Sequence, residues 1–275
     1  MSSHVWSGEK KRRAISSSDL KMRLDLNKKY QSKDFQVWLR KRLAIKNGEQ
    51  ILDVGCGTGA QSIPMAEDAG THGRVVSLDI SSDSIEVLKN SVPEHLKDRI
   101  SAYTLDMGFL KDFLKENYKD KFYSLAQCSY ALYYSPKRIE VLEEMQRRTS
   151  PLGRVAVFTP SPPHGMIEFV SKYHDISMPV NDSLYFGENV LRNLFRKCFW
   201  EVEVHYFQSV ISIDCFEDFK SFYEATTYFN SEYANDVYKG AKDQIEKDGA
   251  LNFEKCGILL IGSGNRKFAT EAYSE

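Results

Sequence analysis

The glycines in the stretch "ILDVGCGTGAQ", residues 51–61, are the first residues whose type and spacing point to chemistry. Gly55, Gly57 and Gly59 occupy alternate positions directly after a short apolar run. Glycine at this density weakens a strand or a helix, so the bare backbone must serve another purpose here. Where such a loop opens a helix, its N–H groups can approach a phosphate or a carboxylate closely. The stretch therefore predicts a ligand-binding loop.

Three aspartates share one kind of position along the chain. Asp53 lies two residues before the first glycine, Asp79 ends the apolar run "RVVSLD", and Asp106 follows the next strand-like run within "TLDMGF". If these runs are parallel strands, their carboxyl ends meet at the edge of the sheet where ligands of open α/β sheets bind. A carboxylate at position 53 would repel a pyrophosphate, but it would suit the ammonium group of a ligand that carries an amino acid.

Three kinds of ligand compete for this loop. A nucleoside triphosphate is excluded, because a P-loop needs a lysine after its last glycine and none follows here. A dinucleotide stays open, since Gly55-x-Gly57-x-x-Ala60 matches the permissive dinucleotide fingerprint and Asp79 ends the next strand. S-adenosylmethionine is the third ligand, and the position of Asp53 favours it.

The elements that must position these residues follow from the hydrophobic pattern. From residue 50 onward, short apolar runs alternate with helical periods, which predicts a doubly wound, mostly parallel α/β sheet. A helix at 187–199 and two late strands, one from Trp200 and one at 256–262, are expected to add an antiparallel edge. The other expected strands are 50–54, 74–79, 99–104, 122–128 and 153–159, and the expected helices between them are 59–68, 82–91, 107–117 and 136–148.

The remaining segments predict additions to this sheet. Residues 1–16 are expected to be a disordered arm, and residues 17–47 two helices that form an N-terminal lid. Residues 48–275 would form the main domain, with insertions at about 160–186 and 215–250. The first insertion fits neither the helical nor the strand period, so we expect an irregular connection that closes over the site, and the second insertion is expected to be helical.

On these residues the chain resembles the class I S-adenosylmethionine-dependent methyltransferases. The family's motif acidic-x-Gly-x-Gly-x-Gly stands here as residues 53–59, and the acidic ends of its second and third strands correspond to Asp79 and Asp106. The resemblance is strong over about residues 48–160 and looser over 187–263. It implies a Rossmann-like sheet of seven strands and S-adenosylmethionine as cofactor, with Asp79 at the ribose hydroxyls and Asp106 at the adenine amino group. The cofactor-binding residues that it implies are Asp53, Gly55, Cys56, Gly57, Gly59, Asp79, Ile80, Asp106, Met107 and Ser129.

Several of these residues also have a purely structural explanation. Asp79 could cap the following helix, although Ser81 or Ser82 could do so instead. Asp106 could begin the helix after the third strand. Cys56 is expected to fill space in the loop rather than react, because no basic residue is near it in sequence.

The acceptor is expected to be a small molecule that is methylated at oxygen by in-line transfer. The Asn/Asp-Pro-Pro-Tyr motif of enzymes that methylate exocyclic or amide nitrogens is absent after the fourth strand, where "SYALYY" stands. Lysine and arginine total 37 against 38 aspartates and glutamates, which argues against a nucleic-acid partner. The expected catalytic residues are His164, as a general base with an ordinary pKa near neutrality, and Tyr133 and Tyr134. A loop histidine bonded to a backbone carbonyl is the competing explanation of His164. The two tyrosines would orient the acceptor or contact the sulfonium, although core and rim packing explains them equally well.

Functions of other classes stay open at this point. The chain could bind S-adenosylmethionine without transferring its methyl group, methylate RNA or protein, or act as an NAD-dependent oxidoreductase. Five widely spaced cysteines and six histidines show no metal-ligand spacing, so no metal is expected. No window approaches the roughly 20 apolar residues of a membrane span and no signal peptide is evident, so a cytoplasmic protein without a membrane partner is expected.

Overall fold

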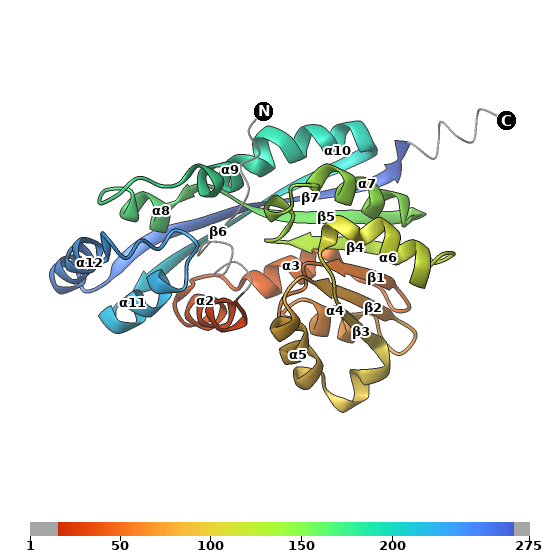
Figure 1. Ribbon diagram of the computed structural model, residues 1–275, viewed down its shortest axis with the longest axis horizontal. Coiled ribbons are helices and arrows are strands. Elements are labelled where there is room, and N and C mark those ends of the chain that lie inside the picture. The colour runs from red at the N-terminus through yellow and green to blue at the C-terminus, as the bar shows by residue number, and fades with distance from the viewer. Residues whose placement is uncertain (1–15, 267–275) are drawn as a thin grey trace.

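Seven strands form a single sheet in the computed structural model, which describes residues 16–266 (Figure 1). The strands are β1 (Gln50–Val54), β2 (Arg74–Asp79), β3 (Ile100–Thr104), β4 (Tyr123–Ser129), β5 (Thr149–His164), β6 (Phe199–Ile213) and β7 (Leu251–Asn265). Their order across the sheet is β3-β2-β1-β4-β5-β7-β6. Strands β1 to β5 are parallel, and β7 runs antiparallel to its neighbours β5 and β6. The prediction of a mostly parallel, seven-stranded sheet with an antiparallel edge is confirmed.

Helices cover both faces of the sheet because the strands are apolar on both sides. Ile51 and Leu125 belong to the core under one face, whereas their neighbours Leu52 and Ala126 belong to the core under the other. This alternation follows from the strand period, in which successive side chains point to opposite faces. The first face carries α3 (Phe35–Leu43), α4 (Ser62–Asp68) and α5 (Ser82–Ser91), and the second carries α6 (Leu110–Asn117), α7 (Arg138–Arg147) and α10 (Arg192–Cys198).

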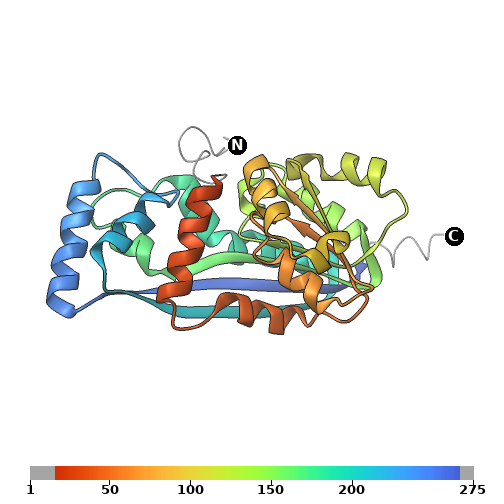
Figure 2. The same cartoon turned by 90° about the horizontal axis from the view of Figure 1, so that it is seen from below.

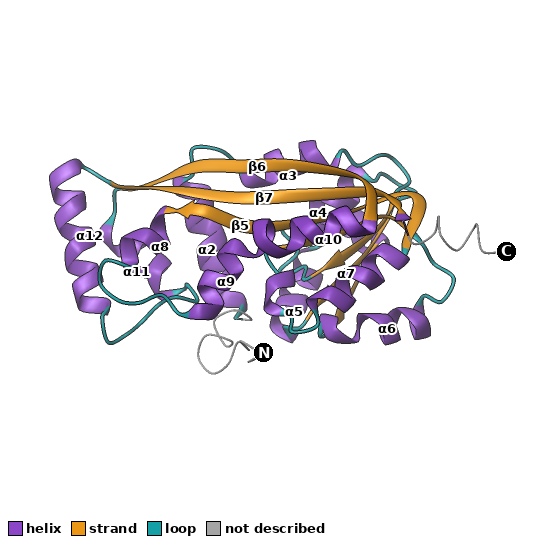
Figure 3. Cartoon of the chain, turned by 90° about the horizontal axis from the view of Figure 1, so that it is seen from above, coloured by secondary structure: helices purple, strands orange, loops and turns teal. Residues whose placement is uncertain are grey.

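The last three strands are much longer than the others. Strands β5, β6 and β7 have 16, 15 and 15 residues, and their far ends pass the carboxyl ends of the parallel strands (Figure 3). These far ends carry a third core, to which Ile211, Ile213, Leu251 and Phe253 contribute. We call these projecting strand ends and the helices packed on them the extension. Its helices are α2 (Ser17–Tyr30), α8 (Gly165–Val170), α11 (Phe216–Glu224) and α12 (Ala234–Asp248).

The prediction of an irregular connection over residues 160–186 is wrong. Residues 160–164 continue β5, because their backbone pairs with the beginning of β7. Most of the following residues are helical, in α8 and in α9 (Met178–Phe186). The strand that continues β5 contains "PSPP" and finds its partner far along the chain, so no local period could reveal it. A π-helical turn (Gly187–Leu191) then joins α9 to α10.

Both predicted N-terminal helices are present, but they lie in different places. Helix α3 packs on the sheet through Phe35 and its neighbours, as part of the helical layer. Helix α2 instead lies between α11 of the extension and the helical layer around α5, and it also contacts β6 (Figure 2). The side chains of Lys29 and Tyr30 each bond Asp218 of α11 at 2.6 Å, which ties the end of α2 to the extension. The predicted disordered arm lies, apart from Ser16, outside the described residues.

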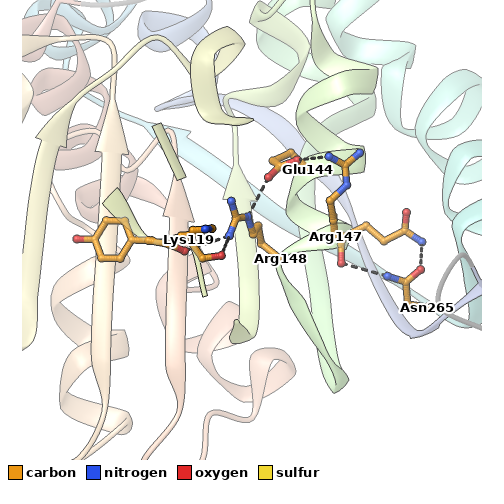
Figure 4. Close-up of polar contacts among 7 residues, drawn as sticks. Lys119, Glu144, Arg147, Arg148 and Asn265 are labelled. Carbon is orange, nitrogen blue, oxygen red and sulfur yellow. Dashed lines mark hydrogen bonds and ion pairs between the residues drawn. The ribbon is translucent and has the colours of Figure 1, made fainter. Parts of the chain in front are cut away.

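A network of buried charges lies at the amino edge of the sheet, far from the glycine loop (Figure 4). The carboxylate of Glu144 on α7 is buried and accepts from Arg147 and Arg148, each at 3.0 Å. Arg148 also donates from Nη1 to the carbonyl of Lys119, 2.8 Å away, in the loop before β4. Every charge that this network buries has a partner of opposite sign, so removing one partner would leave a buried charge uncompensated.

Candidate functional site

A cavity of about 420 Å³ opens at the carboxyl edge of the sheet, between the glycine loop and the extension. Residues from α2, from the ends of β1, β2 and β4, and from the extension line it together. The residues from the sequence analysis that line the cavity are Gly55, Cys56, Gly57, Asp79, Ile80, Asp106, Met107, Ser129, Tyr133, Tyr134 and His164. Asp53 and Gly59 are not among the lining residues. We call the part formed by the glycine loop and the aspartates the cofactor side, and the part formed by the extension the acceptor side.

The glycine loop is held against the end of β2 by its own N–H groups. Gly55 N–H donates to the carbonyl of Leu78 at 2.7 Å, and Gly57 N–H donates to the Asp79 carboxylate at 2.8 Å. Gly57 has a φ of 53°, in the left-handed region that favours glycine. A Cβ at Gly57 would also lie 2.8 Å from Cδ2 of Leu20, so α2 packs directly on the loop. The glycines thus allow a tight turn and a close approach of α2.

Asp79 had two explanations, a helix cap and a ligand-binding residue, and the structure assigns the cap to another residue. Ser81 caps α5, because its Oγ accepts from the backbone N–H of Ser84 at 3.2 Å. Asp79 instead accepts from Gly57 and Ser81 N–H and lines the cavity. Burial raises the pKa of its carboxyl group above the ordinary value. Ile80 beside it is 41% exposed although its side chain is large and apolar, so an apolar surface faces the cavity next to a carboxylate.

Asp106 caps a turn and also lies on the wall of the cavity. Its Oδ1 accepts from the backbone N–H of Gly108 at 2.8 Å and so caps the turn Met107–Phe109. The same residue lines the cavity, as does Met107. A helix-starting aspartate and a ligand-facing aspartate are therefore compatible at this strand end.

Asp53 lies beneath the glycine loop and reaches the cavity through other residues. It is fully buried and accepts hydrogen bonds from Ser62 Oγ and Gln127 Nε2. Gln127 Oε1 accepts from Ser129 Oγ at 2.9 Å, and Ser129 lines the cavity. Burial raises the pKa of Asp53 to about 6. The sequence analysis missed Gln127, and its signal was a lone amide within the buried strand "YSLAQCS".

His164 lies on the acceptor side in surroundings that change its chemistry. Its Nδ1 is buried and has no hydrogen-bond partner among the described residues, and the Tyr228 ring is 6.3 Å away between centroids. Burial and the charge of Lys255 lower the pKa of His164 to about 4. The expectation of a histidine with an ordinary pKa near neutrality is therefore wrong, because that expectation ignored burial. The imidazole is neutral at physiological pH and can accept a hydrogen bond.

Tyr133 and Tyr134 are both core residues and cavity residues. Their ring centroids are 4.5 Å apart, and Tyr133 is buried in the core under the sheet. Both line the cavity, so their packing in the core is compatible with contact to a ligand. Burial raises the pKa of the Tyr133 hydroxyl, which keeps its proton and can donate it in a hydrogen bond.

Other cavity residues had no clear signal in the sequence. Arg23 of α2 and Lys255 of β7 line the acceptor side, as does Tyr228 of the loop between α11 and α12. Arg23 looked like one of many charges on an exposed helix, and Lys255 precedes the apolar run "CGILLIG". Tyr228 lies among several other aromatic residues between positions 216 and 238, a pattern typical of core packing. Only the extension brings these three together.

Three further observations concern the Cys56 thiol, possible metal ligands and possible membrane spans. Burial, with Asp53 and Asp79 nearby, raises the pKa of the Cys56 thiol, so this cysteine stays protonated and unreactive. Within residues 16–266, no three side chains of His, Cys, Asp or Glu are grouped so that they could hold a metal ion. In the same part of the chain, no helix combines the length and apolar character needed to cross a bilayer.

Comparison with known families matches the region around the cofactor side. The family model of the methyltransferase domain matches residues 45–196. A demethylmenaquinone methyltransferase from Listeria welshimeri is 30% identical over 145 residues, which are 51% of this chain and 58% of that relative. Another from Oceanobacillus iheyensis is 30% identical over 123 residues, 45% of this chain and 49% of the relative. The match therefore spans only about half the length of these curated relatives.

Solved structures share the fold at low sequence identity. A protein from Bacillus halodurans has a TM-score of 0.58 at 17% identity, over 82% of this chain and 97% of that one. The YcgJ protein from Bacillus subtilis has a TM-score of 0.57 at 13% identity, over 82% and 96%. The [4+2]-cyclase SpnF has a TM-score of 0.51 at 17% identity, over 85% and 86%. At these identities the likeness shows the fold alone.

Proposed function

The chain belongs to the family of class I S-adenosylmethionine-dependent methyltransferases, and on that premise we propose that it transfers a methyl group to an oxygen atom of a small-molecule acceptor. Its cofactor is S-adenosylmethionine, so the dinucleotide interpretation of the glycine loop is wrong. The observation that carries the proposal is one continuous cavity in which the aspartates of the cofactor side and the aromatic residues of the acceptor side meet.

The cofactor side offers groups that fit the cofactor. Asp79 would accept hydrogen bonds from the ribose hydroxyls, and Asp106 would accept from the adenine amino group. The exposed side chain of Ile80 would cover the adenine ring with apolar surface. Asp53 would act on the ammonium group through Gln127 and Ser129 rather than directly. When bound, the cofactor supplies a methyl carbon that its sulfonium has already activated.

The acceptor side would orient a small molecule and exclude water. Its lining is mostly apolar and aromatic, which supports an acceptor that carries a ring or a chain. The names of the relatives point the same way, since demethylmenaquinone is a small molecule. The neutral His164 would accept the proton of an acceptor hydroxyl, and Tyr133 or Tyr134 would hold its oxygen in line with the methyl group.

A second function has one observation in its favour. A structure of the same fold is named a [4+2]-cyclase, so this fold does not by itself require methyl transfer. The alternative is a protein that binds S-adenosylmethionine and catalyses or regulates another reaction.

The two functions differ in whether the protein forms a methylated product. The purified chain should first be titrated calorimetrically with S-adenosylhomocysteine, and binding is expected. It should then be incubated with methyl-tritiated S-adenosylmethionine and a panel of phenols, hydroxyquinones, hydroxy acids and alcohols. A labelled product with its methyl on oxygen supports the proposal. Binding without any labelled product supports the second function, and a product methylated only on nitrogen or carbon contradicts the choice of oxygen.

A further inference from the structure

Two cationic side chains line the acceptor side without a carboxylate partner among residues 16–266. Arg23 donates from Nη1 to the backbone carbonyl of Ala225 at 2.5 Å and makes no ion pair within the described part of the chain. The Lys255 ammonium lies 5.6 Å from the centre of the Tyr130 ring, and it too has no ion pair there. A ring face and a carbonyl attract a cation, but neither carries the full negative charge that would neutralise it.

The positive charge of Arg23 acts on the Lys255 ammonium, which is also positive. Burial and the positive charge of Arg23 lower the pKa of Lys255 to about 8. Glu254 is next to Lys255 in sequence, but it lies on the opposite face of the strand, where it accepts from Gln208 Nε2 at 3.0 Å. The aspartates of the cofactor side are not among the charges that act on Lys255. The acceptor side therefore carries positive charge that the described residues leave uncompensated.

We propose that the methyl acceptor carries an anionic group, a carboxylate or a phosphate, which binds between Arg23 and Lys255. This inference rests on the proposed function, since it describes the acceptor of the same site. Two like charges in a poorly solvated cavity repel each other, and an anion between them removes that repulsion and restores part of the lost solvation. The rest of the acceptor is apolar or aromatic, because Tyr133, Phe222 and Tyr228 line the same space.

The bound anion also fixes how the acceptor lies in the cavity. Lys255 pairs with His164 in the β5–β7 ladder, so the charged end of the acceptor lies beside this histidine. The opposite end then faces the glycine loop and Ser129, where the methyl group arrives. A negative charge beside His164 raises its pKa again, which makes it a better proton acceptor only when the correct acceptor is bound.

Matched probes test this charge requirement directly. Phenylacetate, phenyl phosphate and the neutral 2-phenylacetamide should be titrated into the protein saturated with S-adenosylhomocysteine. We expect at least one anion to bind about 10-fold or more tightly than the amide, as for a hydrogen bond to a charged group. Lys255→Met and Arg23→Gln should each lose most of this preference. Lys89→Met, on the exposed face of α5, should keep it and serves as the matched control.

The outcomes separate this inference from the proposed function. S-adenosylhomocysteine should bind the parent and all variants with the same Kd, which also verifies that they fold; a parent that does not bind it contradicts the proposed function itself. If the cofactor product binds but the amide binds as tightly as both anions, or if no probe binds, the inference is overturned. The same holds if Lys255→Met and Arg23→Gln both keep the preference. A preference for phenyl phosphate over phenylacetate assigns a phosphate, and the reverse assigns a carboxylate.

Discussion

The two edges of the sheet carry buried charges in opposite states of pairing. At the amino edge, Glu144 accepts from Arg147 and Arg148, and Arg154 makes two bonds of 3.1 Å to the carboxylate of Glu49. At the carboxyl edge, the charged residues of the cavity face backbone groups, hydroxyls, amides and aromatic rings instead of opposite charges. The same chain thus neutralises its charges at one edge and leaves them uncompensated at the other.

The pKa values at the carboxyl edge show what this difference means. Burial raises the pKa of Asp53 and Asp79 and lowers the pKa of His164 and Lys255, so each group is driven toward its neutral form. A structural ion pair would shift these values the other way. Groups held in this state are expected where a ligand supplies the missing charge or hydrogen bond. In this protein, pairing with an opposite charge, rather than burial, distinguishes the structural charges of the amino edge from the charges that line the cavity.

Breaking the paired edge should have the largest effect. Glu144→Ala leaves Arg148 buried without its carboxylate, so the free energy of unfolding should fall by about 3–5 kcal/mol. Urea denaturation measures this loss, and calorimetry should show an unchanged Kd for S-adenosylhomocysteine. Glu86→Ala on the exposed face of α5 is the control and should change stability by less than about 0.5 kcal/mol. A loss of similar size in both variants would remove the distinction between the edges.

Neutralising Asp53 should raise the free energy of unfolding, whereas Glu144→Ala should lower it. Its folded-state pKa of about 6 lies above the ordinary value of 3.8, so the native state binds more protons between these values and stability falls as pH rises through them. Asp53→Asn removes this fall, so at pH 7 its free energy of unfolding should exceed that of the parent by up to about 3 kcal/mol. Unfolding curves of both proteins from pH 4 to 7 measure the difference. A difference that does not grow with pH would show that Asp53 has no raised pKa.

Removing Asp79 should weaken cofactor binding more than stability. Asp79→Ala loses the acceptor for the ribose hydroxyls, so binding of S-adenosylhomocysteine should weaken by about 1.5–3 kcal/mol, the range for a hydrogen bond to a charged group. Calorimetric titration measures this change, and circular dichroism verifies the fold. Ser82→Ala, beside the cap of α5, should bind like the parent. An unchanged Kd in folded Asp79→Ala would contradict the assigned role.

Replacing His164 should lower turnover at neutral pH, and the parent should show a diagnostic pH profile. His164→Gln is expected to lower kcat by about 100-fold, at the low end for an acid–base group, because a base with a pKa near 4 accepts a proton weakly. The kcat of the parent should stay level above pH 6 and fall only as the pH approaches 4, where the imidazole becomes protonated. Binding of an anionic acceptor should move this fall to higher pH. A fall beginning near pH 6.5 even without an anionic group on the acceptor would mean that burial does not perturb His164.

Much of the cofactor side could be predicted because its determinants are local. A strand, a glycine turn and a helix follow one another within residues 50–68, and the aspartates at 79 and 106 end the next two strands. Parallel strands align their carboxyl ends, so the pattern alone brings these residues to one edge. The choice between a helix cap and a ligand role for Asp79 was different, since it depended on which way the side chain turns.

The acceptor side could not be predicted, because its residues meet only through long-range pairing. Arg23 and Lys255 come from opposite ends of the chain, and the extended β5–β7 ladder and α2 bring them to one cavity. The proline-rich start of the first insertion hides a strand whose partner is β7. Periodicity reports only which face of an element is apolar, so it carries no information about such pairs.

The sequence by itself therefore determined the family, the cofactor and the order of elements around the glycine loop, since these depend on residues close together in the chain. The tertiary structure alone decided which charges are paired. It connects Asp53 to the cavity through Gln127, places Lys255 across from His164, and shields both side chains in part from water. Burial and neighbouring charge set a pKa, and both are properties of the folded arrangement, so the acid–base chemistry of this site exists only once the chain has folded.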